Sequence, residues 1–187
     1  MTFPEISQLE TSRLRLRKLT PEDTDHYFRY LFGSESVSRY MLWNPHKDIS
    51  ESAASIQKVL HRYEEGRCYR WAIAHKETDS LMGIIDLLRF DEESESCSFA
   101  YMLGQPFWGC GYGTEALKAV FSFAFTEMEV KSIIADHMAE NPASGRVMEK
   151  SGMRKIGFLP KKYEKNGILQ DAVQYRITKD DWTETRC

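Results

Sequence analysis

The stretch QPFWGCGYGTEA, residues 105–116, is the most informative part of this chain for its fold. Three glycines at every second position, Gly109, Gly111 and Gly113, let the backbone bend tightly and expose its amide groups. The stretch lies between a predicted strand and a predicted long helix, and helix N-termini carry unpaired N–H groups and a partial positive charge. Such a loop can hold a phosphate or pyrophosphate. A plain strand-to-helix turn of small residues is the alternative, and the spacing alone does not separate the two.

Two well-known nucleotide-binding loops do not fit this stretch. A Walker A loop needs Lys-Ser or Lys-Thr after its glycines, and neither pair follows here. A dinucleotide fingerprint needs GxGxxG early in a βαβ unit, with an acidic residue about 20 positions further on. Here the spacing is GxGxG, and several strands that look antiparallel precede it.

Outward from the loop, periodicity predicts a mixed α/β layer structure in the order β-α-α-β-β-β-α-β-α-β-β, with helices covering a sheet. The predicted strands are Arg13–Arg17, Tyr69–Ile73, Leu81–Leu88, Ser96–Leu103, Ile133–Met138, Met153–Tyr163 and Gln170–Thr178. The predicted helices run from Thr20 to Phe32, from Ser50 to before Gly66, from Thr114 to Met128 and from Asn141 to Gly152. Asn166-Gly167 predicts a tight hairpin between the last two strands.

Composition limits the kinds of partner that we expect. The 187 residues suit one domain, and the net charge of −3 argues against nucleic acid as a direct partner. We expect no membrane span, no secretion signal and hence a cytoplasmic location. The four cysteines, Cys68, Cys97, Cys110 and Cys187, lack CxxC spacing, so we expect free thiols and no metal site.

Four segments together resemble the GNAT acetyltransferase superfamily, and within it the RimJ/RimL-type ribosomal-protein N-acetyltransferases. They are residues 9–17 (LETSRLRLR), 100–103 (AYML), 108–117 (WGCGYGTEAL) and 141–144 (NPAS) with 149–153 (EKSGM). The resemblance covers nearly the whole chain. It implies a single N-acetyltransferase domain, residues 1–187, with a mostly antiparallel central sheet. It also implies acetyl-CoA as cosubstrate, without a metal.

The resemblance also implies where acetyl-CoA binds. The backbone amides of the loop would hold the pyrophosphate, and the exposed edge of the preceding strand would pair with the two amides of pantetheine. Asn141 would contact the pantetheine arm, although it is also a good helix N-cap before Pro142, and one residue could serve both roles. The implied cofactor-binding residues are Tyr101, Met102, Leu103, Gly109, Cys110, Gly111, Tyr112, Gly113, Thr114 and Asn141.

The catalytic groups are less well defined by the sequence. Related enzymes often have a serine near the acetyl thioester, here Ser144, whereas the position of the tyrosine acid in many GNAT enzymes is Met148, which cannot donate a proton. Asp86, an acid within an apolar run, is a candidate base, or its side chain faces solvent or pairs with a basic neighbour. A separate hypothesis makes Cys110 a nucleophile with His137 as its base.

The RimJ/RimL resemblance implies that the acceptor is a primary amine, most plausibly the α-amino group of a ribosomal or other protein or of a peptide. The alternatives are a small-molecule amine, such as a polyamine, an amino acid or an antibiotic, and a CoA-binding module without catalysis. A monomer and a homodimer both fit the sequence.

Overall fold

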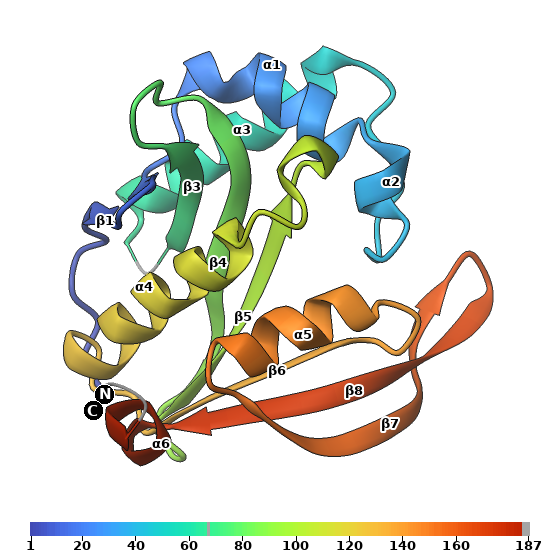
Figure 1. Cartoon of the computed structure of the whole chain (residues 1–187). Helices are drawn as coiled ribbons and strands as arrows, with labels where there is room; N and C mark the ends of the chain where they lie inside the picture. The colour runs from blue at the N-terminus through green and yellow to red at the C-terminus, as the bar shows by residue number, and fades with distance from the viewer. Residues whose placement is uncertain (67, 185–187) are drawn as a thin grey trace.

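The computed structural model describes residues 1–66 and 68–184, and an eight-stranded sheet forms its centre (Figure 1). The order across the sheet is β1-β2-β3-β4-β5-β6-β8-β7, and every neighbouring pair is antiparallel except β5 with β6. The strands are β1 (Leu9–Glu10), β2 (Leu14–Arg17), β3 (Tyr69–His75), β4 (Leu81–Asp91), β5 (Ser96–Leu103), β6 (Ser132–Met138), β7 (Arg154–Lys165) and β8 (Ile168–Thr178). The predicted mixed, mostly antiparallel sheet is confirmed.

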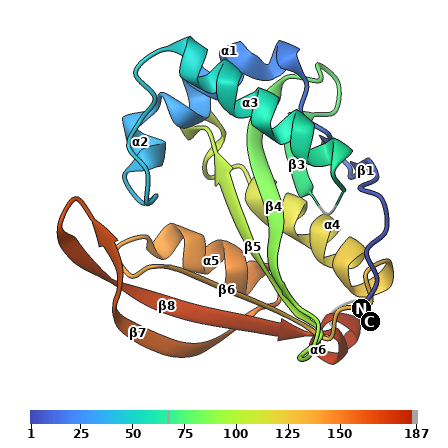
Figure 2. The same ribbon diagram turned by 180° about the vertical axis from the view of Figure 1, so that it is seen from behind.

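The parallel pair β5–β6 is short. Residues 96–98 of β5 pair with residues 132–134 of β6, and within the described chain this ladder goes no further. Beyond it, β5 continues to pair with β4 and β6 continues to pair with β8, so the two strands diverge, as both views show (Figures 1 and 2). The sheet is therefore split by an opening at the carboxyl end of β5, directly before the glycine-rich loop.

Helices cover both faces of the sheet. On one face lie α4 (Tyr112–Thr126), which connects β5 to β6, and α5 (Pro142–Lys150). On the other face lie α1 (Thr24–His26) and α3 (Ile49–Glu64), over a second group of buried side chains (Figure 2). The remaining elements are the turns η1 (Pro21–Asp23) and η3 (Gln105–Phe107), the π-helix η2 (Tyr27–Phe32), α2 (Glu35–Ser38) and α6 (Lys179–Glu184). No helix in the described ranges is long and apolar enough to cross a membrane.

The predicted helix over residues 20–32 is present but not regular. It is a 3₁₀ turn, an α turn and a π-helix in succession, and the amide of Gly33 donates to the carbonyl of Phe28, five residues back, at 2.8 Å. In an α-helix, residues five apart lie on different sides, whereas a π turn brings them closer together. Here it allows the rings of Tyr27 and Phe32 to stack at 4.4 Å between centroids.

Other boundaries shift for identifiable reasons. α3 begins at Ile49 rather than Ser50, because the Asp48 carboxylate accepts hydrogen bonds from the first amides of the helix. α4 begins at Tyr112 rather than Thr114, since Gly111 already serves as its N-cap. The hairpin at Asn166-Gly167 is confirmed, with positive φ angles of 51° and 78°. Three predicted free thiols are found at positions 68, 97 and 110, and Cys187 lies outside the described residues.

Gly83 on β4 gives a test of the geometry beside the opening. A Cβ at this position would overlap the carbonyl of Met102 and lie 2.6 Å from the side chain of Leu103 on β5. We therefore expect Gly83→Ala to lower the free energy of unfolding by about 1–3 kcal/mol, measured by chemical denaturation. Gly157→Ala is the matched control, because nothing lies within 4 Å of a Cβ there. Equal stability of the two variants would contradict this packing.

Candidate active site

The loop between β5 and α4 enters its helix through two residues in the left-handed backbone region. Gly109 has a φ of 76°, and Gly111, the N-cap of α4, has a φ of 83°. Gly113 lies in the first turn, where a Cβ would be 3.3 Å from the Tyr101 ring and 3.4 Å from Val147 on α5. The absence of a side chain at position 113 thus lets α4 pack closely against β5 and α5.

The edge of β5 that faces the opening can be identified from its register. The amide of Gly104 donates to the carbonyl of Met82 at 2.8 Å, and the alternation of an antiparallel ladder then directs the polar groups of Met102 toward β4. The backbone groups of Tyr101 and Leu103 point the other way. The indole N–H of Trp108 donates to the Leu103 carbonyl at 2.7 Å. Tyr101 is therefore the residue whose amide and carbonyl are best placed for pairing across the opening.

The first turn of α5 lies beside the same opening. The Asn141 side chain accepts a hydrogen bond from the amide of Ser144 at 3.3 Å, so the N-cap role is present, whereas contact with pantetheine stays a prediction. Burial raises the pKa of the Tyr101 phenol, and a hydrogen bond with the Ser144 side chain opposes this shift. Met148, further along α5, is buried.

Asp86 is tied into an ion pair with a basic neighbour. The guanidinium of Arg70, directly across on β3, donates two hydrogen bonds to the Asp86 carboxylate, at 2.5 and 2.9 Å. The side chains are 20% and 14% exposed. Burial opposes the charge of Arg70, but the hydrogen bonds and charge of Asp86 outweigh it and raise the arginine pKa. The pairing that the sequence left open is thus present, and a catalytic role for Asp86 stays a hypothesis.

A second buried carboxylate lies on the strand across the opening from β5, and it was missed in the sequence. Asp136 on β6 is only 8% exposed at its side chain, and it accepts hydrogen bonds from the hydroxyl of Tyr163 and the ammonium of Lys162. Burial and the adjacent Asp136 both raise the pKa of Tyr163, so the phenol keeps its proton. The signal was an acid within the apolar strand 133–138, the same signal that singled out Asp86.

The geometry gives no support to a Cys–His pair. The His137 ring is buried and its Nδ1 lies 2.7 Å from the carbonyl of Met138, with Tyr175 beside it. Cys110 is exposed, and its thiol lies 3.5 Å from the carbonyl of Trp108. Within the described residues no hydrogen bond joins the two side chains.

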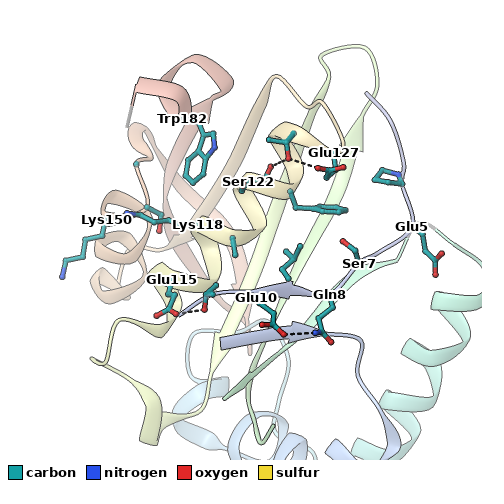
Figure 3. A pocket seen from close by; sticks show the side chains of 18 of the residues that line it. Glu5, Ser7, Gln8, Glu10, Glu115, Lys118, Ser122, Glu127, Lys150 and Trp182 are labelled. Atoms are coloured by element: carbon teal, nitrogen blue, oxygen red, sulfur yellow. Dashed lines mark hydrogen bonds between the residues drawn. The ribbon is translucent and has the colours of Figure 1, made fainter. Parts of the chain in front are cut away.

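A hollow of about 920 Å³ lies outside this opening (Figure 3). It follows α4 from Glu115 past Lys118 and Ser122 toward Trp182, and the N-terminal segment forms its other wall. In the described chain its lining includes none of the residues predicted to bind the cofactor. It adjoins the glycine loop only at Glu115, so the opening between β5 and β6 remains the candidate active site.

A glycine-rich helix N-terminus at the mouth of a split sheet is what the GNAT acetyltransferases have, and the comparisons with known proteins agree. A family model described as the acetyltransferase (GNAT) domain matches residues 13–154. The chain is 31% identical over 178 residues to the uncharacterized N-acetyltransferase p20 of Bacillus licheniformis, covering 95% of this chain and 99% of that protein. The chain therefore belongs to the GNAT acetyltransferase family, whose members use acetyl-CoA, and it is an N-acetyltransferase.

More distant relatives act on different amines. The ribosomal protein uS5-alanine N-acetyltransferase of Escherichia coli (strain K12) is 24% identical over 187 residues, covering 96% of this chain and 94% of that protein. Among solved structures, a GNAT-family acetyltransferase from Bacillus anthracis has a TM-score of 0.82 at 23% identity, covering 93% and 99% of the two chains. A Vibrio cholerae spermidine N-acetyltransferase in complex with CoA and spermine has a TM-score of 0.78 at 20% identity, covering 92% and 99%.

The loop assignment can be tested at its glycines. In Gly111→Val a branched side chain would occupy a left-handed backbone position, and in Gly113→Val it would fill the space beside Tyr101. We expect both variants to bind CoA at least about tenfold more weakly in calorimetry, because the loop amides could no longer converge on the pyrophosphate. Gly167→Val, at the remote hairpin, controls for general strain. Unchanged CoA affinity in both loop variants would overturn the assignment.

Proposed function

We propose that this acetyltransferase transfers the acetyl group of acetyl-CoA directly, in a ternary complex, to the α-amino group of a protein or peptide. Acetyl transfer to an amine follows from the family. The finer assignment rests on one observation, the neutralisation of the two carboxylates that flank the opening.

Asp86 and Asp136 lie on the same face of the sheet. Asp86 on β4 pairs with Ala100 on β5. Ser98 lies two residues before Ala100 on β5, and so on the same face, and it pairs with Ile134 on β6. Since alternate residues of a strand share a face, Asp136 lies on this side too, across the opening from Asp86. It is the face opposite α4, because the ring of Tyr101, on the alternate position, lies against Gly113 of α4.

Both carboxylates already have cationic partners. Asp86 is paired with Arg70, and Asp136 holds Lys162 together with the Tyr163 hydroxyl. A polyamine binds through several charges and needs carboxylates that are not neutralised by the protein, since a paired carboxylate gains little from a second cation. A single neutral amine has no such need, so this face suits a monoamine acceptor better than a polycation.

Among monoamines, an α-amino group is the easier nucleophile. Its pKa is about 8, whereas that of lysine is about 10.4, so near neutral pH far more of the α-amine is unprotonated. A site without a free carboxylate base is better matched to such an acceptor. The similarity to an enzyme named for the alanine of ribosomal protein uS5 supports the same class.

The reaction then depends mainly on placement. The neutral nitrogen attacks the thioester carbonyl carbon, the C–N bond forms, and the C–S bond breaks to release the CoA thiolate. The nitrogen loses one proton to water. A thiol pKa of about 8.5 makes a departing thiolate tolerable. Ser144 beside Tyr101 is the proposed proton donor to the sulfur, and it takes a proton back from water, whereas Met148 cannot donate one.

The acceptor assignment is tested by measuring CoA release with peptides bearing free N-termini, N-terminally blocked peptides with lysine, polyamines, amino acids and aminoglycosides. We expect free α-amines to react fastest, with a rate that rises with pH and levels off at about pH 8, where the amine becomes neutral. Mass spectrometry locates the acetyl group. Products found only on lysine, polyamines or antibiotics would refute the α-amine acceptor and leave the acetyltransferase assignment intact.

Asp86→Asn tests whether this carboxylate is a base. If placement dominates, kcat should fall by less than about tenfold, while stability falls because Arg70 loses its buried partner. Asp79→Asn is the matched control: Asp79 also pairs with arginines, Arg15 and Arg17, and its side chain is 47% exposed. Loss of turnover in Asp86→Asn with CoA binding and folding intact would make Asp86 the base.

A further inference from the structure

The first turn of α4 carries a carboxylate at a position where the proposed function requires an anion to bind. Glu115 lies four residues after the N-cap Gly111, and its amide donates to the Gly111 carbonyl at 3.1 Å. A free negative charge this close to a pyrophosphate would repel it, at distances where salt screens incompletely. The chain must therefore neutralise Glu115 if the loop is to hold CoA.

Residues 11–13, directly before β2, neutralise Glu115. Glu115 accepts hydrogen bonds from the Thr11 hydroxyl at 2.6 Å, the Ser12 hydroxyl at 3.1 Å and the Arg13 amide at 2.9 Å. The guanidinium of Arg13 adds two further contacts, 2.8 Å from Nε and 2.6 Å from a terminal nitrogen. Partial burial would raise the pKa of Glu115, but these hydrogen bonds outweigh it and lower the pKa, so the side chain stays ionised and held.

Arg13 also holds the loop backbone directly. One terminal nitrogen donates to the Cys110 carbonyl at 3.0 Å, and the guanidinium lies over the Tyr112 ring at 4.4 Å. In a planar trans peptide the carbonyl of one residue and the amide of the next point in opposite directions. By holding the Cys110 carbonyl, Arg13 turns the amide of Gly111 to the other side, where a loop ligand would be bound.

We infer that Arg13 is a positioning residue of the cofactor site, which neutralises Glu115 and orients the Cys110–Gly111 peptide for the pyrophosphate of CoA. The inference rests on the proposed function, because it takes acetyl-CoA as the ligand of the loop. It assigns a role to the TSR part of the N-terminal motif, which is far from the loop in sequence.

The test is CoA binding by calorimetry with Arg13→Met, Glu115→Gln and the double variant. We expect Arg13→Met to weaken binding about tenfold at low salt, because it removes charge-assisted hydrogen bonds and exposes the Glu115 charge. The double variant should bind at least about threefold more tightly than Arg13→Met, since the repelling carboxylate is then absent, but more weakly than the wild type, since the Cys110 carbonyl is no longer held. The defect of Arg13→Met should shrink as salt rises from about 0.05 to about 0.5 M.

Arg15→Met is the matched control, since Arg15 lies two residues further along and pairs with Asp79, away from the loop. It should keep the affinity of the wild type. Arg13→Lys, which keeps one charge, should fall between the wild type and Arg13→Met, and it serves if Arg13→Met does not fold. KM for acetyl-CoA should rise in step with the CoA dissociation constant, while kcat at saturating cofactor stays close to that of the wild type.

An Arg13→Met or Arg13→Lys variant that binds CoA as well as the wild type would overturn the inference and leave the proposed function standing. A double variant as weak as Arg13→Met would also overturn it, since the inference requires that the unneutralised charge of Glu115 cause part of the loss. A wild-type protein that does not bind CoA would overturn the proposed function and the inference together.

Discussion

The short parallel ladder between β5 and β6 is the constraint on which the site depends. It ends at Ser98 and Ile134, and each strand then follows its antiparallel neighbour on the other side. Parallel neighbours cannot be joined by a hairpin and need a crossover, here α4. The crossover starts where β5 ends, so the N-terminus of α4 necessarily lies at the mouth of the split. The glycine-rich loop at the mouth of the split and the strand edge beside it are thus consequences of one topological choice.

This choice also explains why so many unusual residues gather there. The loop has to turn from strand to helix within a few residues, and Gly109 and Gly111 take the left-handed conformations this requires. α5 and β5 both lie close to the first turn of α4, and Gly113 makes this close approach possible. The N-terminal segment then contacts the outer side of the loop through Glu115. Residues that lie about a hundred positions earlier in the chain therefore help to fix the shape of the loop.

The sequence predicted the element order, the sheet type, the loop and the cap at Asn141, because each depends on local patterns: periodicity, glycine spacing and N-cap chemistry. It did not predict what depends on register between distant strands. Whether Asp86 stands alone or meets Arg70 is decided by the alignment of β3 with β4. Which residue of the 101–103 edge faces the split is likewise set by the ladder with β4. The irregular helix over residues 20–32 also escaped prediction, since the apolar spacing does not distinguish a π turn, which here accompanies the stacking of Tyr27 on Phe32, from an α turn.

The two sides of the split face different proposed ligands, but on both sides carboxylates are neutralised by basic side chains. On the α4 side the proposed ligand is an anion, and Glu115, in the first turn of the helix, is neutralised by Arg13. On the other face, where we propose that the amine binds, Asp86 and Asp136 are neutralised by Arg70 and Lys162. If an ammonium ion were the bound form of the acceptor, free carboxylates on that face would favour it and would hold it protonated, which is the unreactive form. A face whose carboxylates are neutralised binds the ammonium form of the acceptor more weakly, but it does not raise the pKa of the amine. It therefore leaves the nitrogen free to lose its proton near neutral pH, which favours an acceptor whose own pKa is already low.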